Sequence, residues 1–121
     1  MTTKIIDFKN DVTSISPAFP ADRVLGGSPE QTMFNQFQDP SEQMLSGIWD
    51  CTEGKWQADY SAKSEFCHIL SGKVVLTDKD GTASTFAAGD SFVIPMGFEG
   101  TWEVVEPVRK LYAIVTPQQH Q

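Results

Sequence analysis

Short runs in which apolar and polar residues alternate fill the chain from about Leu45 onward, and turn-forming residues separate these runs. The turn signals recur about every 8 to 12 residues, a spacing typical of all-β sandwiches and barrels. Asp78-Lys79-Asp80-Gly81 predicts a hairpin turn, and Ser71-Gly72 and Ala88-Gly89-Asp90 mark further turns. No helix of convincing length is indicated. The pattern predicts an all-β domain with strands at residues 45–51, 55–60, 65–70, 73–78, 83–87, 91–94, 100–106 and 109–115.

The same alternation assigns residues to faces, because successive side chains of a strand point to opposite sides. Glu65, Cys67 and Ile69 share one face of their predicted strand. Both faces of these strands carry apolar residues, which suits a barrel wall that a second sheet or another segment covers from outside. The other sets that share a face are Phe66, His68 and Leu70; Gly100, Trp102 and Val104; and Lys110, Tyr112 and Ile114.

Residues 1–43 lack a clean period and are rich in proline, glycine and other turn formers. We expect an extended N-terminal arm with short strands and no core of its own, followed by a barrel over residues 44–121. The arm's scattered apolar residues need a surface to cover them, so we expect it to pack on the barrel or across a dimer partner. These residues are Ile5, Ile6, Phe8, Met33, Phe34 and Phe37.

Composition narrows the classes of partner. A chain of 121 residues fits one domain, small enough that dimerisation would add stability. The net charge of −7 argues against a nucleic-acid or anionic-membrane surface, since such surfaces need clustered Lys and Arg. No apolar run approaches the roughly 18 residues that span a bilayer, and residues 1–9 show no signal-peptide pattern, so a cytoplasmic location is expected. Cys51 and Cys67 lack disulfide-scaffold or metal-type spacing and are expected to be reduced, buried thiols.

Two motifs stand out in the second half of the chain. The first runs from Glu65 to Gly72, and the second is the stretch Gly-Asp-Ser-Phe-Val-Ile-Pro-Met-Gly-Phe-Glu-Gly from Gly89 to Gly100. Together with their flanking residues, from Trp49 to Val115, they resemble the small single-domain cupins related to the (S)-ureidoglycine aminohydrolase cupin domain. The resemblance implies a cupin double-stranded β-helix, a jelly-roll barrel, and commonly a homodimer.

In cupin enzymes these motifs usually supply two or three histidines and one glutamate to a metal. The resemblance places Glu65 at the glutamate position, but no histidine stands at a ligand position. Borderline metals such as Fe, Ni and Zn favour imidazole and thiolate, so no metal cofactor is predicted. A metal held by Glu65 and Asp59 remains an alternative. The histidine positions fall on Asp59 and Ser61, or on Ala58 and Tyr60 in the other register, and on Gly100.

Glu65 is the sharpest candidate for a functional residue. A carboxylate inside an apolar barrel needs a donor, so Glu65 is either a structural group satisfied by a neighbour, or a general base or ligand-binding group with a raised pKa. Lys110 and Tyr112 share a face of a late strand, so both are candidates to meet Glu65 inside the barrel. The alternative for Lys110 is a surface position beside Arg109.

Four further residues are candidates for ligand contact: Tyr60, Trp102, Cys67 and Asp59. Tyr60 offers a phenolic donor, although strand tyrosines often only pack. Trp102 either fills the space that a metal would take or forms an aromatic wall for a ligand. Cys67 lies on the face of Glu65, but no histidine is placed to activate it as a nucleophile.

The leading interpretation is a cytoplasmic cupin that binds a small polar metabolite. If it is catalytic, Glu65 is the base and Lys110 or a tyrosine the acid of a metal-independent reaction, and only the resemblance suggests a ureide-like substrate. The alternatives are a non-catalytic binding or sensor module and a metal-dependent enzyme with oxygen-rich ligation.

Overall fold

The computed structural model describes residues 3–117, and these form an all-β domain, as the sequence pattern predicts. The only helical segment in this range is a short 3-10 turn, η1 (Ala21–Arg23), and no helix there is long and apolar enough to cross a membrane. Every pairing between strands is antiparallel. The strands are β1 (Val24–Gly27), β2 (Gln31–Gln38), β3 (Met44–Cys51), β4 (Gly54–Asp59), β5 (Ser64–Asp78), β6 (Ala83–Ala87), β7 (Ser91–Ile94) and β8 (Glu99–Val115).

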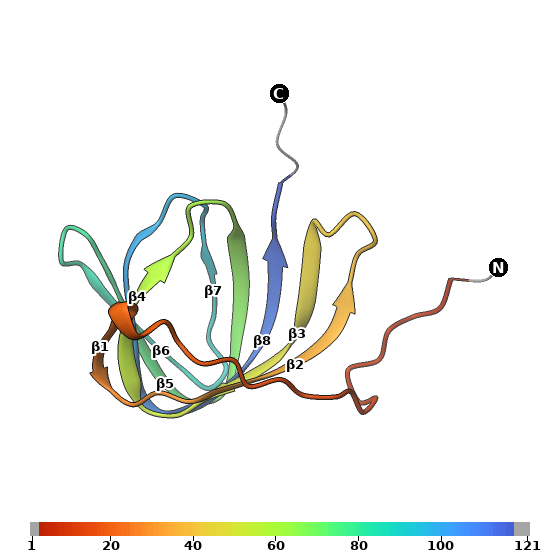
Figure 1. The fold of residues 1–121 in the computed structure, drawn as a ribbon, viewed down its shortest axis with the longest axis horizontal. Coiled ribbons are helices and arrows are strands. Elements are labelled where there is room, and N and C mark those ends of the chain that lie inside the picture. The colour runs from red at the N-terminus through yellow and green to blue at the C-terminus, as the bar shows by residue number, and fades with distance from the viewer. Residues whose placement is uncertain (1–2, 118–121) are drawn as a thin grey trace.

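Two long strands, β5 and β8, organise the barrel. They pair with each other from Ser64 opposite Val115 to Asp78 opposite Gly100. The eight strands form one sheet that bends into two halves, called the first and second sheet below, and both long strands belong to each half. The first sheet has the order β2-β3-β8-β5-β7 and uses the first half of β5. The second has the order β1-β4-β8-β5-β6 and uses the second half of β5. Figure 1 shows the two sheets as opposite walls of the predicted jelly-roll barrel.

The sequence pattern predicts breaks in both long strands, at Ser71-Gly72 and between residues 106 and 109, and these two predictions are wrong. The β5–β8 register instead shifts several times between Ile69 and Val74, so the strands bend from one sheet into the other without ending. Gly72 has a φ of +88°, and a Cβ atom there would lie 2.1 Å from the carbonyl oxygen of Pro107. A glycine is therefore required at this corner, where the two backbones come too close for a side chain.

The assignment of faces is confirmed. Glu65, Cys67 and Ile69 are all buried, whereas Phe66 and Leu70 on the other face of β5 are 46% and 42% exposed. The buried residues of β8 follow the predicted sets as well. The core lies between the two sheets and consists of Trp49, Cys51, Trp56, Tyr60, Cys67, Ile69, Val74, Leu76, Ile94, Trp102, Val104, Val108 and Tyr112.

The N-terminal region contributes two strands to the barrel, since β1 pairs with β4 and β2 pairs with β3. Before β1 the chain runs in extended form across the barrel, as Figure 1 shows, and Ile15 forms a two-way backbone bridge with Met33 of β2. The first residues of this segment make little contact, and Ile5 is 93% exposed. Phe19, in contrast, packs against the core.

Candidate functional site

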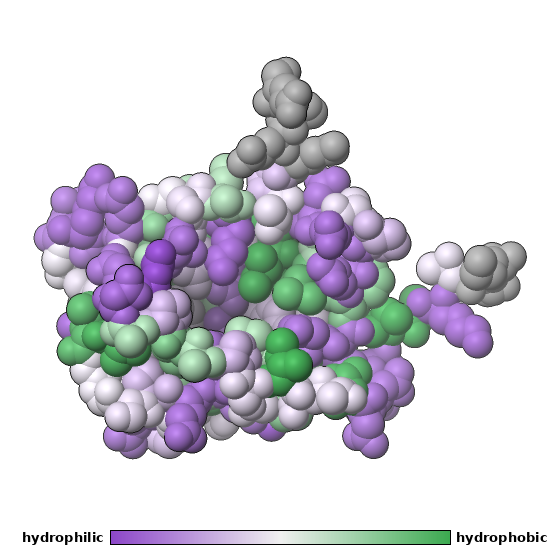
Figure 2. Space-filling model, viewed as in Figure 1, coloured by the Kyte–Doolittle hydropathy of each residue, from purple (hydrophilic) through white to green (hydrophobic). Residues whose placement is uncertain are grey.

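A cavity of about 510 Å³ opens between the two sheets on the side that the N-terminal segment crosses. Figure 2 shows this face of the molecule, with a recess near its centre that hydrophobic and hydrophilic residues both border. All three tryptophans of the chain lie in the cavity wall. The lining residues are Phe19, Pro20, Arg23, Gln31, Met33, Asn35, Leu45, Trp49, Trp56, Gln57, Ala58, Asp59, Tyr60, Lys63, Glu65, Trp102, Lys110, Tyr112 and Ile114.

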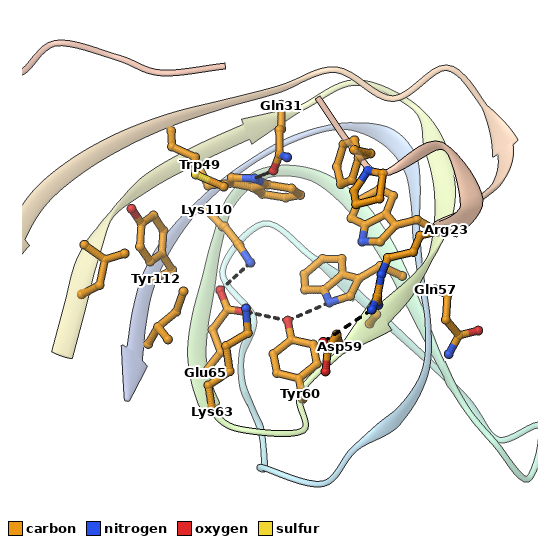
Figure 3. A pocket seen from close by; sticks show the side chains of 18 of the residues that line it. Arg23, Gln31, Trp49, Gln57, Asp59, Tyr60, Lys63, Glu65, Lys110 and Tyr112 are labelled. Carbon is orange, nitrogen blue, oxygen red and sulfur yellow. Dashed lines mark hydrogen bonds and ion pairs between the residues drawn. The ribbon is translucent and has the colours of Figure 1, made fainter. Parts of the chain in front are cut away.

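Glu65 and Lys110 form an ion pair in this wall, and the pairing that the sequence predicts is confirmed. Nζ of Lys110 donates a hydrogen bond of 2.7 Å to Oε2 of Glu65, and the two side chains are only 5% and 6% exposed. Glu65 lies opposite Ile114 and Lys110 lies opposite Ile69 in the β5–β8 pair, so both side chains point to the inward face, where they meet. In Figure 3 the two side chains converge with Tyr60 at the centre of the site.

Two indole rings enclose the Lys110 ammonium. Nζ lies 4.5 Å from the ring centroid of Trp49 and 4.4 Å from that of Trp102, which places the cation against two aromatic faces. Nζ also lies 3.5 Å from the sulfur of Cys67. Burial alone would lower the pKa of Lys110, but the charge of Glu65, its hydrogen bond and the contact with Cys67 together outweigh burial and raise this pKa above its ordinary value. Lys110 is therefore a fixed cation of the site.

Tyr60 holds the second oxygen of Glu65. Its hydroxyl donates a hydrogen bond of 2.6 Å to Oε1 and accepts one of 3.0 Å from Nε1 of Trp102. Burial and the charge of Glu65 raise the pKa of Tyr60, so its hydroxyl stays protonated. Burial by itself would raise the pKa of Glu65, but the ammonium of Lys110 and the hydrogen bonds of both neighbours bring this pKa below its ordinary value. Glu65 is thus an ionised carboxylate with a donor on each oxygen.

The remaining predicted residues are less directly connected to Glu65. Tyr112 lines the cavity, but its hydroxyl donates to Oδ1 of Asn35 on β2, and burial raises its pKa to about 12. Asp59 lies at the exposed rim, where it forms an ion pair with Arg23 and accepts hydrogen bonds from Ser61. The hydrogen bonds from Ser61, with a smaller contribution from the charges of Arg23 and Lys63, hold the pKa of Asp59 below its usual range.

The prediction that Cys67 contacts a ligand is not supported, because Cys67 is fully buried and does not line the cavity. It shares the inward face of Glu65, but it lies deeper in the core, in contact with the Lys110 ammonium. Burial raises the pKa of its thiol to about 12, which makes a thiolate nucleophile unfavourable at neutral pH.

Sequence reasoning missed several lining residues. Trp56 had a usable signal, since it alternates with Ala58 on β4 and with Tyr60 just beyond the end of that strand, and all three line the cavity. Trp49 also lines the cavity, and its indole N–H donates to Oε1 of Gln31 at 2.9 Å. Gln31 had no such signal, because only the pairing of β2 with β3 brings it to the site.

The residues at the cupin ligand positions do not fit a metal. Ala58 and Tyr60 line the cavity, and neither is a typical metal ligand. Asp59 also borders the cavity, but its carboxylate lies at the exposed rim and pairs with Arg23. A Cβ atom on Gly100 would lie 2.0 Å from the carbonyl oxygen of Thr77, which leaves no room for a side chain. Within residues 3–117 no three His, Cys, Asp or Glu side chains form a cluster that could hold a metal ion. The Lys110 ammonium beside Glu65 also opposes a second cation there.

Residues 38–112, more than half of the chain, match the EutQ-like cupin domain. No curated protein matches the chain. A protein of unknown function from Pseudomonas syringae has a similar fold, with a TM-score of 0.76 and 24% identity over 86% of this chain; the match spans only 45% of that protein. The Clostridium difficile EutQ protein matches with a TM-score of 0.64 and 17% identity, over 75% of this chain and 66% of that one. A predicted oxalate decarboxylase from Thermotoga maritima matches with a TM-score of 0.71 and 16% identity, over 94% of this chain and 100% of that one.

Proposed function

The chain belongs to the EutQ-like cupin domain family, and we propose that its barrel binds one small polar metabolite without a metal. The observation that carries this proposal is the Glu65–Lys110 pair, which lines a cavity of about 510 Å³ while remaining almost fully buried. Small-molecule pockets are typically about 300–1,000 Å³, mostly apolar, with a few polar groups that fix orientation. This cavity has both properties.

The polar groups favour a ligand that carries N–H donors. Each oxygen of Glu65 accepts one hydrogen bond from within the protein, and a carboxylate oxygen has capacity for a second. The rings of Trp56 and Trp102 lie parallel, 3° apart in plane, and stack with their centroids 6.1 Å apart in the cavity wall. An amide or ureido group supplies such N–H donors. The relation to ureidoglycine aminohydrolase cupins, suggested by sequence resemblance, points to the same chemistry.

Binding accounts for the site better than acid–base catalysis. Efficient proton transfer needs groups whose pKa values lie near the working pH. Here the pKa of Glu65 is lowered and those of Lys110 and Tyr60 are raised, so each group moves away from neutrality. The interpretation of Glu65 as base and Lys110 as acid therefore requires a ligand that reverses these shifts. A non-catalytic binding or sensor domain requires no such change.

Tryptophan fluorescence tests the proposal directly, because all three tryptophans line the cavity. We expect a saturable change when small ureido or amide compounds are added. Glu65→Gln keeps the size of the side chain but removes the charge, and should weaken binding about tenfold or more. Asp50→Asn makes the same chemical change on the outer face of β3 and serves as the control. Equal binding by both variants and the wild type would contradict the proposal.

Elemental analysis of untagged protein separates this proposal from the metal-dependent alternative. Stoichiometric Mn, Fe, Ni or Zn, with ligand binding that a chelator abolishes, would favour the oxygen-ligated metalloenzyme. Turnover of a bound compound, followed by NMR, would favour the acid–base enzyme. The homodimer and the cytoplasmic location remain predictions from the sequence.

A further inference from the structure

The chain before η1 lies across the cavity face and is lightly attached to the barrel. Residues 15–20, which we call the strap, run over the face in which the cavity opens, as Figure 1 shows. Of these residues only Phe19 is partly buried, and the others are exposed. The pairing of the strap with the barrel backbone is a two-way bridge between Ile15 and Met33 of β2. A segment with so little burial has low local stability, which favours its detachment.

Two residues of the strap form part of the cavity wall. Phe19 and Pro20 both line the cavity, and the centroid of the Phe19 ring lies 4.4 Å from that of Trp56. With this cover in place Trp56 is only 8% exposed. Detachment of the strap removes the cover, which exposes the indole of Trp56 and widens the cavity on that side.

Gln31 of β2 joins the strap to the centre of the site. Its Nε2 donates a hydrogen bond of 3.1 Å to the carbonyl oxygen of Pro17, and its Oε1 accepts the bond of 2.9 Å from the indole N–H of Trp49. Figure 3 shows Gln31 beside Trp49, whose ring in turn faces the Lys110 ammonium. Because one planar amide group makes both bonds, it cannot turn toward one partner without disturbing the other. The position of the strap is therefore linked to that of the Trp49 ring.

We infer that the strap is a gate of the cavity: it detaches from β2 as a unit, and Gln31 couples its release to the Trp49 ring. β2 is an edge strand, so water takes up the backbone groups that detachment frees. Phe19 leaves with the strap, which opens the wall over Trp56. The gate goes beyond the proposed function, since it controls access to the cavity and does not depend on the class of ligand.

Hydrogen exchange followed by NMR tests the release. Ile15 and Met33 each donate a backbone N–H to the carbonyl oxygen of the other, at 3.0 and 2.8 Å, so detachment as a unit exposes both amides together. We expect equal protection factors for these two amides, at least about 100-fold below those of the slowest amides of the central strand β5.

Variants of Gln31 test the coupling. Gln31→Leu removes both side-chain bonds and should speed exchange of the two strap amides about tenfold. Gln31→Glu keeps an acceptor for the indole N–H of Trp49 but has no donor for Pro17, so it should speed the same amides while the Trp49 indole stays protected. Gln38→Leu is the matched control, because Gln38 lies at the exposed end of β2 outside the cavity wall. It should leave both exchange rates unchanged.

A disulfide can lock the strap to β2. The hydroxyl oxygens of Ser16 and Thr32 lie 3.4 Å apart, and this pair is next to the hydrogen-bonded bridge, where opposite side chains come closest. The double variant Ser16→Cys/Thr32→Cys should therefore form a disulfide with oxidised glutathione. Cys51 and Cys67 should not compete, because both are buried and burial raises the pKa of each thiol to about 12.

The lock tests whether release of the strap opens the cavity. In the oxidised double variant, exchange of the Trp56 indole N–H should slow about tenfold or more, and reduction should restore the original rate. Ser16→Cys/Thr32→Ser, treated with the same oxidant, cannot form the cross-link and is the control. It should exchange like the wild type.

Each part of the gate has an outcome that would overturn it. Unequal protection of the Ile15 and Met33 amides, or protection of both as high as in β5, would rule out release as a unit. Unchanged exchange of the Trp56 indole in the oxidised protein would show that release does not open the cavity. Gln31 variants with wild-type rates would remove the coupling. None of these measurements uses a ligand, so they stand apart from the binding tests of the proposed function.

Discussion

The two faces of β8 carry ion pairs on neighbouring residues, and the contrast between them shows what burial does to the same chemistry. Lys110 points inward to Glu65 at 2.7 Å, where the side chains are 5% and 6% exposed. Arg109 points outward to Asp50 at 3.3 Å, where they are 45% and 37% exposed. The inner pair has a further donor, Tyr60, and two indole rings around its cation, whereas the outer pair has the ring of Phe34 beside Arg109. The side of the strand to which a residue points therefore decides whether its ion pair is exposed at the surface or buried in the site.

Breaking the inner pair should have the largest effect. Lys110→Met leaves the Glu65 carboxylate buried without its cation, which should lower the free energy of unfolding by about 3–5 kcal/mol and raise the pKa of Glu65. The loss can be measured by urea denaturation of the single variants Lys110→Met and Glu65→Leu and of the double variant. The double variant should recover most of the loss, because it leaves no unpaired charge. A single variant as stable as the wild type would contradict the importance of burial.

The second-largest effect should be the change in the free energy of unfolding with pH. The folded pKa of Glu65 lies below its ordinary value of 4.5, so its contribution is complete above that pH and is lost as the pH falls through the folded pKa. The folded pKa of Lys110 lies above its ordinary value of 10.5, so its contribution is complete below that pH and is lost only as the pH rises through the folded pKa.

The free-energy difference between the wild type and the Glu65→Leu/Lys110→Met variant is the quantity to measure. We expect it to be constant between about pH 6 and pH 9 and to fall on the acid side of that range. A difference that grows on acidification would contradict the ionised pair.

Removal of the Tyr60 hydroxyl should destabilise the protein less than removal of the Lys110 charge, and it tests the additional donor of the inner pair. Tyr60→Phe leaves Oε1 of Glu65 and the indole N–H of Trp102 without their shared partner, and should cost about 1–3 kcal/mol. Tyr112→Phe, which removes the hydrogen bond to Asn35 at the cavity wall, is the matched control and should cost less. Equal losses in the two variants, measured by chemical denaturation, would show that the Tyr60 hydroxyl has no special part in the network.

The outer pair should give the smallest effect. Both its groups are more than one third exposed, so solvent and salt screen their attraction. Arg109→Met should change the free energy of unfolding by only about 0–1 kcal/mol, and part of that should come from lost contact with Phe34. The change should shrink further in 1 M salt, where the Debye length is about 3 Å. A loss as large as that of Lys110→Met would remove the distinction between the two faces.

The all-β architecture and the direction of each central side chain follow from local pattern. The alternation places Glu65 and Lys110 inward, and the cost of an unpaired buried charge then predicts that they meet. The bends at Gly72 and at Pro107 look like strand ends in the sequence, because glycine and proline mark bulges in a continuous strand as well as turns. Cys67 and Tyr112 both point inward, as the alternation predicts. Their contacts do not follow from that alternation: Cys67 lies deep in the core beside Lys110, and Tyr112 bonds to Asn35 of β2.

The sequence by itself determined the all-β class, the faces of the central strands and the absence of histidine from the expected ligand positions, because all three depend only on residue type and spacing. Tertiary structure alone decided that the three indoles and two ion pairs surround one cavity, with Gln31 and Arg23 brought in from the N-terminal region. It also joined the strap to Trp49 through Gln31. The physical reason is that these contacts join segments far apart along the chain, and strand pairing, which local periodicity does not specify, sets their distances.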